Sequence, residues 1–470
     1  MHVPSRDLLR DGLSIQNGGL FFDNVELSNI ARKHGTPVFV FSRRRLTKNV
    51  DQVRKAFGHH LKNTELYYAA KANSNLDVLR TLRRAGVKPE ISSEGEMFLI
   101  AVAGFKPTDV IFNGPAKTRR ELELAVRLGI RSINLDSIDE LERLVGVCRS
   151  LRKRANISFR VLPYVHAGAS IIQTGIHESK FGINYEEIVR AYRRALEYQD
   201  FVKPVGIHGH IGSQNTDVQS WQEFALKLGQ KFVEVERELS LKLEHIDLGG
   251  GLPVRYARNE TQQPMAEYLA SKTSDEEIAS SIAKGLEASR CRPITVIMEP
   301  GRRLVANSAV LLSRVVGTKQ RVSEKWLYLD MGFNVTPSSR VLRWYYETSA
   351  AEKMSKSHYV PYRLAGPLCD SADVYHDWEG ELLGTPQLPK SHLFPDNMAN
   401  GDLVAMLDVG AYNIDLMNHF NGRLLPGAVM IDAGGRIKLI RKPENYSDLI
   451  AMEPHSKVKV EQVLRRMKGR

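Results

Sequence analysis

A regular alternation of short apolar segments with helical segments between residues 37 and 305 constrains the fold of this chain more than any other feature. Eight apolar segments predict strands, and most end at or beside a polar residue or a glycine. They are Leu66–Lys71, Pro89–Ser93, Val110–Gly114, Ser132–Asp136, Ile157–Val161, Gly206–His210, His245–Gly249 and Thr295–Glu299. Eight strand–helix units within about 240 residues favour an α/β fold with a closed parallel (β/α)8 TIM-type barrel. The alternative is an open doubly wound sheet, but no GxGxxG turn follows the first strand.

The segments between these strands carry helix-start signals. Thr118, Ser137 and Ser274 are each followed three residues later by a glutamate, which is the spacing of a capping box. Asn75 can cap the helix after the first of these strands, and Gly86 ends that helix. These signals favour a chain in which strands alternate with helices and disfavour one made of strands alone.

Beyond residue 305 the pattern changes, because apolar segments follow one another without helices of crossover length between them. Residues 306–470 therefore predict a C-terminal β domain of sandwich or barrel-like form. Within it, Ala433–Gly435 predicts a hairpin turn. We expect His376–Asn400, which is rich in proline and glycine, to form a long surface loop.

Two boundaries follow from this change of pattern. The barrel domain is expected to occupy residues 37–305 and to begin with a strand at Pro37–Ser42, ahead of the eight repeated strands. Residues 1–36 contain a helix from about Val25 to His34, and we expect this N-terminal segment to pack with the β domain.

Composition and charge exclude several classes of protein. The chain has no apolar run long enough to span a membrane, and its first residues lack the apolar core of a signal peptide. Its three cysteines are far apart and odd in number, which predicts reduced thiols in the cytoplasm. The net charge of +12 is spread along the chain, apart from a basic tail at Val463–Arg470, so we expect no nucleic-acid partner. This charge suits an anionic small molecule such as a phosphate ester.

Lys71 is unusual because it directly follows the apolar run Leu66–Ala70. Burial of an ammonium group is unfavourable unless the group is paired or neutral. The simplest interpretation is that the side chain reaches water at the end of the strand. The alternative is a Schiff-base lysine, whose amine becomes nucleophilic when desolvation lowers its pKa.

Four further stretches carry chemically active groups. Gly206–Gln214 contains two histidines that could pair in the core or bind a metal, although no third ligand lies nearby in the sequence. Leu248–Pro253 holds three glycines whose N–H groups could bind an anion or simply form a turn. Glu299–Arg302 sets a carboxylate near a guanidinium, as in a structural ion pair. Gly366–Asp373 puts a thiol beside carboxylates, where a buried inert cysteine is the default interpretation.

Together these groups match the requirements of one cofactor. The glycine turn and Arg302 would hold a phosphate, while Glu299 would pair with a protonated ring nitrogen. A histidine would stack on a planar ring, and Lys71 would form an imine. Pyridoxal phosphate requires a Schiff-base lysine and an acidic partner for its pyridinium nitrogen.

Seven motifs occur in the order found in a known family. They are Tyr68–Asn73, Ser179–Gly182, His210–Gln214, Gly249–Gly251, Glu299–Arg302, Cys369–Ser371 and Gly410–Tyr412. Over about residues 25 to 450, the chain resembles the alanine-racemase-like (fold type III) pyridoxal-phosphate decarboxylases. This family includes diaminopimelate, ornithine and D-ornithine/lysine decarboxylases.

The resemblance implies catalytic roles for four residues. Lys71 would hold pyridoxal 5'-phosphate as a Schiff base, His210 would stack on its ring, and Glu299 would keep its nitrogen protonated. Cys369 would return a proton to the substrate Cα and, with Asp370, would enter the active site from the partner subunit of a homodimer. The cofactor phosphate would be bound by Ser213, Gly249, Gly250, Gly251, Gly301, Arg302 and Tyr412. Lys180 and Asp373 resemble an ion pair across the same dimer.

The substrate is an amino acid whose identity depends on details of the resemblance. The chain has Cys-Asp-Ser at Cys369–Ser371, where diaminopimelate enzymes typically have Cys-Glu-Ser, and their Arg-Pro-Ala-Leu-Tyr segment is missing from Phe333–Tyr346. Ala365–Asp370 and Val429–Asp432 resemble the D-ornithine/lysine branch, whereas Ala69–Asn73 is closer to the diaminopimelate branch.

These features favour decarboxylation of a basic diamino acid, of the D-ornithine or D-lysine type, to a diamine and CO₂. The distal ammonium of the substrate would then meet Asp370. One alternative is a diaminopimelate decarboxylase that makes L-lysine. Another is a non-catalytic regulatory homologue that has lost the cofactor, although the retained Lys71, Glu299 and Cys369 argue against it.

Overall fold

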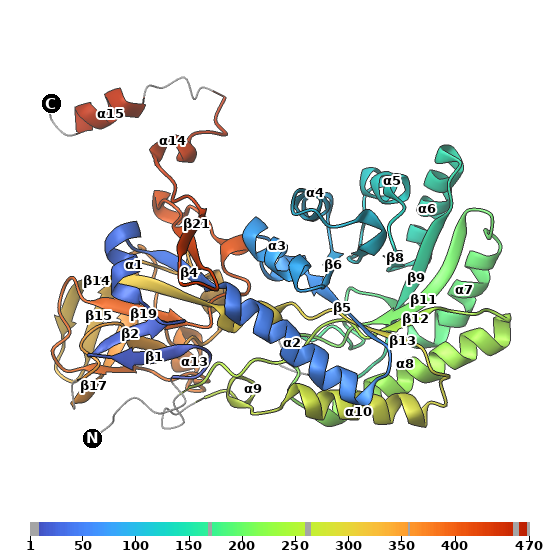
Figure 1. Cartoon of the computed structure of the whole chain (residues 1–470), viewed down its shortest axis with the longest axis horizontal. Helices are drawn as coiled ribbons and strands as arrows, with labels where there is room; N and C mark the ends of the chain where they lie inside the picture. Colours follow the sequence, from blue (N-terminus) through green and yellow to red (C-terminus); the bar gives the residue numbers. More distant parts are fainter. Residues whose placement is uncertain (1–8, 168–171, 259–264, 356–357, 455–459, 468–470) are drawn as a thin grey trace. The chain divides into compact units, whose positions relative to one another are not determined.

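The computed structural model describes residues 9–167, 172–258, 265–355, 358–454 and 460–467. The chain divides into two compact units, a β-rich unit and a barrel unit. The β-rich unit comprises Met1–Arg44, Tyr256–Ala266 and Asn307–Arg470, and the barrel unit comprises Arg45–Arg255 and Glu267–Ala306. Figure 1 shows the course of the chain through both units.

Eight parallel strands close into a barrel in the second unit. They are β5 (Thr64–Ala69), β6 (Lys88–Ile91), β7 (Ile111–Phe112), β8 (Ser132–Leu135), β9 (Ala155–Leu162), β11 (Val202–Gly209), β12 (His245–Asp247) and β13 (Thr295–Met298). Around the ring the order is β9, β11, β12, β13, β5, β6, β7 and β8, and β8 pairs with β9. A short strand, β10 (Ile183–Asn184), adds to β9. The eight predicted strands and the closed barrel are therefore confirmed.

Helices surround these strands, as Figure 1 shows, with α4 to α6 along one side and α8 and α10 packed together along another. Their bounds are α2 (Arg43–His60), α3 (Leu76–Arg84), α4 (Glu94–Val102), α5 (Arg119–Leu128), α6 (Ile138–Leu151), α7 (Ile188–Leu196), α8 (Val218–Leu239), α9 (Glu267–Ala270), α10 (Asp275–Ala288) and α11 (Arg302–Val305). The core between the strands includes Tyr67, Ile111 and Ile297, all fully buried. Within the described ranges, none of the helices combines the length and apolar character that crossing a membrane requires.

Most of the predicted helix starts are confirmed. Complete capping boxes begin α5 at Thr118 and α10 at Ser274, and the side chain of Asn75 caps α3. Ser137 also caps its helix, α6, but the box there is incomplete. The carboxylate of Glu140 instead accepts hydrogen bonds from the buried ammonium of Lys117 and from a backbone N–H. A buried lysine needs this counter-charge more than the helix needs a second cap bond.

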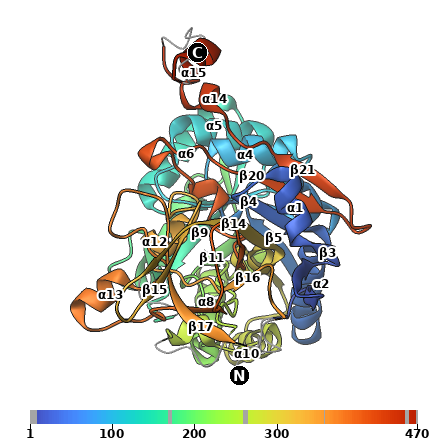
Figure 2. The ribbon, with the colours of Figure 1, turned by 90° about the vertical axis from the view of Figure 1, so that its left-hand side faces the viewer.

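The β-rich unit is built on a sheet with the order β18-β17-β15-β14-β4-β20-β21, and β19 joins β14 to β16 (Figure 2). Its strands are β4 (Val38–Ser42), β14 (Ala309–Gln320), β15 (Lys325–Leu329), β16 (Thr348–Ala350), β17 (Tyr359–Ala365), β18 (His392–Pro395), β19 (Leu403–Leu407), β20 (Gly427–Ile431) and β21 (Ile437–Arg441). The predicted hairpin between β20 and β21 is confirmed.

The same unit contains a small sheet and short helices. The sheet consists of β1 (Leu13–Gln16), β2 (Gly19–Phe22) and β3 (Val25–Glu26), and the helices are α1 (Leu27–His34), α12 (Pro337–Val341), α13 (Trp378–Leu383), α14 (Tyr446–Leu449) and α15 (Val460–Met467). Of the predicted basic tail, residues 468–470 lie outside the described residues, as do residues 1–8 at the other end.

Two sequence-based expectations differ from the structure. The strand at Pro37–Ser42, expected at the start of the barrel domain, is β4 of the β-rich unit, where it pairs antiparallel with β14 and parallel with β20. All five β4 residues are buried, and the central place between β14 and β20 provides that burial. The expected loop His376–Asn400 contains α13 and β18, because the side chain of Asp377 caps α13.

Candidate active site

The carboxyl ends of four consecutive barrel strands carry the main predicted site residues. Lys71 follows β5, His210 follows β11, Gly249 follows β12 and Glu299 follows β13. These strands are neighbours in the ring in the order β11, β12, β13, β5. In the sequence, β5 lies far from the other three, so barrel closure is what brings Lys71 beside Glu299. The carboxyl ends of the strands are where barrel enzymes place their chemistry.

Lys71 lies in a short helical turn, η1 (Ala70–Ala72), instead of at the end of the predicted strand. Its side chain is 48% exposed, and its Nζ lies 3.1 Å from an oxygen of Glu90. Glu90 is completely buried on β6. Sequence reasoning missed Glu90, although a glutamate inside an apolar predicted strand was a signal. The lysine thus reaches the mouth of the barrel while a buried carboxylate holds its ammonium.

Glu299 is buried and held by amide donors. The Nδ2 of Asn113 donates to both carboxylate oxygens at 2.8 and 2.9 Å, and the Oδ1 of Asn113 accepts a bond from Asn134 at 2.7 Å. Burial alone would raise the pKa of Glu299, but the nearby His208, Lys71 and Asp247 lower the pKa to about 2. Glu299 is therefore an ionised carboxylate in a fixed orientation. Sequence reasoning predicts Asn113 at the end of a strand but assigns it no role. It does not identify Asn134 as a site residue.

His210 presents a neutral imidazole at the end of β11. Burial, then the positive charges of Arg160 and Lys71, hold the pKa of His210 well below its usual value. Its Nδ1 has no hydrogen-bond partner among the described residues. Arg160, one of these two charges, is itself packed on an aromatic ring: its guanidinium lies 4.2 Å from the centre of the Phe181 ring. A neutral ring with an uncommitted nitrogen is suited to stacking on a planar ligand.

The glycine turn Gly249–Gly251 passes very close to its neighbours. Gly249 and Gly251 have φ values of +63° and +114°, which disfavour other residues. A Cβ on Gly249 would lie 2.8 Å from the carbonyl oxygen of Gly209 and 2.9 Å from the Nδ1 of His210. A Cβ on Gly250 would collide with the carbonyl oxygen of Glu299. The turn therefore lies against the imidazole of His210 and the backbone of Glu299, and glycine is required there.

Arg302 and Ser213 complete this end of the barrel. The Nε of Arg302 donates to the Oγ of Ser213 at 3.2 Å, and Arg302 is 4% exposed. Gly301 precedes Arg302 at the start of α11. A guanidinium, a hydroxyl and a glycine turn thus extend from the ends of β13, β11 and β12, and these are groups that bind phosphate.

The other predicted site residues, Cys369, Asp370 and Tyr412, belong to the β-rich unit. Cys369 is exposed, so the interpretation as a buried inert cysteine is wrong. Its backbone N–H donates to the Oδ1 of Asn421 at 2.7 Å. Tyr412 has a φ of +55°, and its carbonyl accepts a bond from Ser338 at 2.6 Å. The roles expected for these residues stay predictions.

Asp373 has an environment that differs from the one expected. It is 3% exposed, and its two oxygens accept the backbone N–H groups of Phe333 and Leu368, each at 2.8 Å. Burial raises the pKa of Asp373 to about 6. Lys180 is exposed, and its ammonium lies 5.2 Å from the centre of the Phe181 ring. These contacts give Asp373 a role within its own loop, and its expected ion pair with Lys180 across a dimer stays a prediction.

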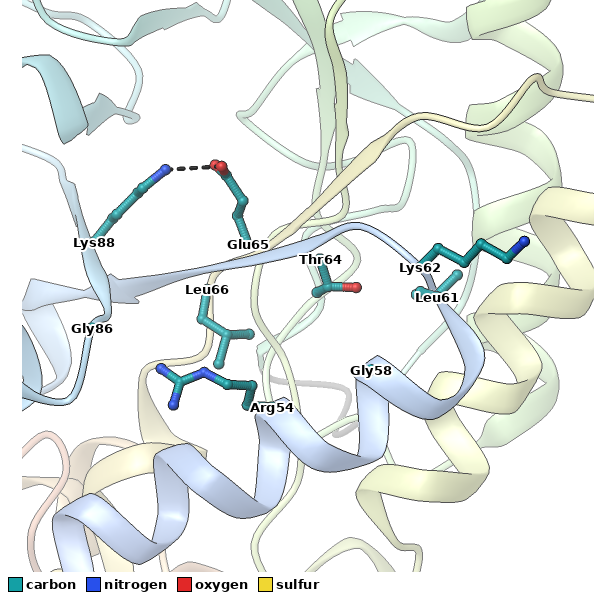
Figure 3. A pocket seen from close by; sticks show the side chains of 9 residues that line it. All are labelled: Arg54, Gly58, Leu61, Lys62, Thr64, Glu65, Leu66, Gly86 and Lys88. Atoms are coloured by element: carbon teal, nitrogen blue, oxygen red, sulfur yellow. Dashed lines mark ion pairs between the residues drawn. The ribbon is translucent and has the colours of Figure 1, made fainter.

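A pocket of about 270 Å³ lies at the opposite, amino ends of β5 and β6 (Figure 3). Lys88 and Glu65 point toward each other there and form an ion pair at 2.9 Å. Since β5 has six residues, this pocket lies roughly 20 Å along the strand from Lys71. None of the predicted site residues lines it.

Comparisons with known proteins agree with this geometry. Residues 43–306 match the family model described as the pyridoxal-binding domain of pyridoxal-dependent decarboxylases. The chain is 35% identical to the diaminopimelate decarboxylase of Archaeoglobus fulgidus, over 93% of this chain and 97% of the relative. The diaminopimelate decarboxylase of Methanocaldococcus jannaschii is 32% identical, over 95% of this chain and 98% of the relative.

Solved structures give the same result. The crystal structure of the M. jannaschii diaminopimelate decarboxylase with L-lysine superposes with a TM-score of 0.83 at 30% identity, covering 94% of this chain and 98% of that one. A lysine/ornithine decarboxylase of Vibrio vulnificus has a TM-score of 0.70 at 23% identity, covering 87% and 98%, and this likeness shows the fold alone. The similarities confirm the resemblance to fold type III decarboxylases, and they favour the diaminopimelate alternative over the D-ornithine or D-lysine interpretation.

Proposed function

Because the chain belongs to the family of pyridoxal-dependent decarboxylases, we propose that it decarboxylates meso-diaminopimelate to L-lysine and CO₂. The observation that carries this proposal is the 35% identity with a diaminopimelate decarboxylase over nearly the whole of both chains. The family comparison also favours an enzyme over a non-catalytic homologue.

Pyridoxal phosphate is the cofactor of this family, and the carboxyl end of the barrel fits it. The fit rests on the turn at Gly249–Gly251, where added side chains would collide with the barrel, and on the bond between Arg302 and Ser213. These residues, with Gly301, would hold the phosphate, and the contact of Tyr412 with it stays an expectation from the resemblance. When bound, the cofactor supplies an electron sink for the charge left on the substrate Cα as CO₂ departs.

The barrel residues then have distinct tasks. Lys71 would hold the cofactor through its amine, and Glu90, 3.1 Å from the Nζ, would stabilise the ammonium form of that amine. Glu299, ionised and fixed by Asn113, would keep a ring nitrogen protonated, which strengthens the electron sink. His210 would cover one face of the ring and keep water from it.

The remaining tasks fall to the β-rich unit of a second copy. We expect the exposed thiol of Cys369 to return the proton to Cα and Asp370 to bind the distal ammonium of the substrate. A homodimer with shared active sites would supply both groups. We expect the partners of the chain to be a second copy of itself and the small-molecule substrate.

One observation favours a second candidate function, decarboxylation of lysine or ornithine to a diamine. The Arg-Pro-Ala-Leu-Tyr segment expected of diaminopimelate enzymes is missing from Phe333–Tyr346. The nearby Arg340 and Arg343 both form ion pairs with Glu379. Because both arginines are already paired with Glu379, neither is an evident replacement for the family's arginine that binds the distal carboxylate of diaminopimelate.

An assay with purified protein and added pyridoxal phosphate separates the two candidates. We expect CO₂ and L-lysine from meso-diaminopimelate, and much lower turnover of D- or L-lysine and D- or L-ornithine. Lys71→Ala is the control for cofactor-dependent turnover. A higher kcat/KM for lysine or ornithine would overturn the proposed substrate while leaving the reaction type intact.

A further inference from the structure

Asp247, the last residue of β12, has two carboxyl oxygens in different environments. The side chain is completely buried. Its Oδ1 accepts the N–H of Gly249 at 2.9 Å. Its Oδ2 is buried and has no hydrogen-bond partner within the described part of the chain. One ring nitrogen of His208 and one carboxylate oxygen each of Asp247 and Glu299 lie within 4.8 Å of one another, so the two buried carboxyl groups are close neighbours.

Two neighbouring buried carboxyl groups do not both ionise at neutral pH, because the second negative charge would be neither solvated nor balanced. The contacts decide which group keeps the proton. Glu299 receives N–H bonds from Asn113 on both oxygens, and the Nε2 of His208 lies 3.6 Å away. Asp247 receives one backbone N–H. Burial and the charge of Glu299 raise the pKa of Asp247 well above its usual value.

We propose that Asp247 is a positioning residue that stays protonated, donates its Oδ2–H to Glu299 and accepts the Gly249 N–H through Oδ1. This pair of bonds joins the glycine turn to the acid that faces the cofactor ring. The charged and titratable groups around the pair include Glu90 on β6, Arg160 on β9, His208 on β11, His210 after β11, His245 on β12, Tyr67 on β5 and Lys71 after β5. Asp247 thus leaves a single negative charge on Glu299 and fixes where that charge lies.

Matched variants distinguish a neutral donor from an anionic group. Asp247→Asn keeps an N–H donor for Glu299 and a carbonyl acceptor for Gly249, so its kcat should stay within about threefold of wild type. Asp247→Leu has similar volume but no donor, so its kcat should fall about 10- to 100-fold, as when other supporting hydrogen-bond partners of active-site groups are lost. The affinity for pyridoxal phosphate should fall with it, because the Gly249 N–H loses its acceptor. Rescue by asparagine alone would not follow from a purely space-filling role.

A second readout does not depend on activity. An infrared spectrum of the cofactor-free protein at neutral pH should contain the C=O band of a protonated carboxyl that is absent from Asp247→Asn. Assignment rests on the loss of the band in this variant, because Glu347, whose pKa burial raises to about 7, also contributes protonated carboxyl. Glu347→Gln is the control and should leave the Asp247 band in place.

Two results would overturn the proposal: a carboxyl band that is unchanged in Asp247→Asn, or an asparagine variant as impaired as the leucine variant. The inference rests on the proposed function only through its kinetic arm. If the protein failed to decarboxylate diaminopimelate, the infrared result would still decide where the proton lies.

Discussion

The two ends of the barrel carry similar groups but differ in how these groups are buried. Each end has a lysine–glutamate ion pair between the β5 region and β6, namely Lys71–Glu90 at 3.1 Å and Lys88–Glu65 at 2.9 Å. The lysine side chains are 48% and 34% exposed. Glu90 is completely buried, whereas Glu65 is 32% exposed beside the pocket of Figure 3.

The amide side chains repeat this contrast. At the carboxyl end, Asn113 holds the buried Glu299 by two bonds. At the amino end, Asn63 donates to the hydroxyl of Thr295 at 2.8 Å on an exposed surface. Water screens exposed ion pairs and can replace exposed hydrogen bonds, whereas a buried polar group has only protein partners to satisfy it. The comparison teaches that a pocket with an ion pair is not in itself a sign of chemistry, whereas a set of buried, mutually oriented polar groups is.

The largest expected effect separates the two lysines. Lys71→Ala should lower kcat on the order of 10,000-fold or more, because the covalent link to the cofactor is lost. Lys88→Ala should leave kcat unchanged and cost less than about 1 kcal/mol of stability. Turnover and the absorbance of the bound imine measure both variants. Imine absorbance that persists in Lys71→Ala would contradict the assignment of this lysine.

The next effect separates the two glutamates. Glu299→Gln retains the shape of the side chain but removes its charge, so kcat should fall about 100- to 1,000-fold, as when a preorganised electrostatic group is lost. Glu65→Gln, at the amino end, should have the turnover of wild type. Steady-state kinetics with saturating cofactor measures both. Equal kcat values for the two variants would remove the functional distinction between the barrel ends.

The pH dependence of stability gives a further contrast. The pKa of Glu299 is lowered from 4.5 to about 2 on folding, so its contribution to stability is present above pH 4.5 and is lost as the pH falls toward 2. The full loss amounts to about 3 kcal/mol, and Glu299→Gln should lack it. Urea unfolding of the cofactor-free protein between about pH 3 and pH 6 measures the difference. A constant difference in unfolding free energy between wild type and Glu299→Gln over this range would argue against an ionised Glu299.

The smallest expected effect concerns the two asparagines. Asn113→Ala removes the two hydrogen bonds that the Nδ2 of Asn113 donates to Glu299 and leaves Asn134 without its acceptor, so it should destabilise the protein by about 1–3 kcal/mol. Asn63→Ala should cost less than about 0.5 kcal/mol, because water replaces its bond. Chemical denaturation measures both. If the exposed asparagine proved the more costly to remove, burial would not be the property that distinguishes the ends.

The sequence by itself determined the elements and much of the site. Apolar runs and capping residues are local signals, so the eight barrel strands and most helix starts could be read from them. The glycine turn and the positions of Lys71, His210 and Glu299 at strand ends followed from the same pattern. Glu90, Asn134 and Asp247 lay within predicted strands, and their unusual polarity was a signal that remained unused.

Tertiary structure decided which of these elements meet. Closure of the ring places β13 beside β5 and so brings Glu299 to Lys71 across more than half of the barrel sequence. Pairing with β14 and β20 draws β4 into the β-rich unit, although its apolar pattern would suit a barrel strand equally well. The protonation of Asp247 likewise depends on a neighbour that only the fold supplies. The local sequence pattern determines whether a segment forms a strand or a helix. Strand pairing and burial depend on residues far away in the sequence, and the charge state of a buried group depends on both.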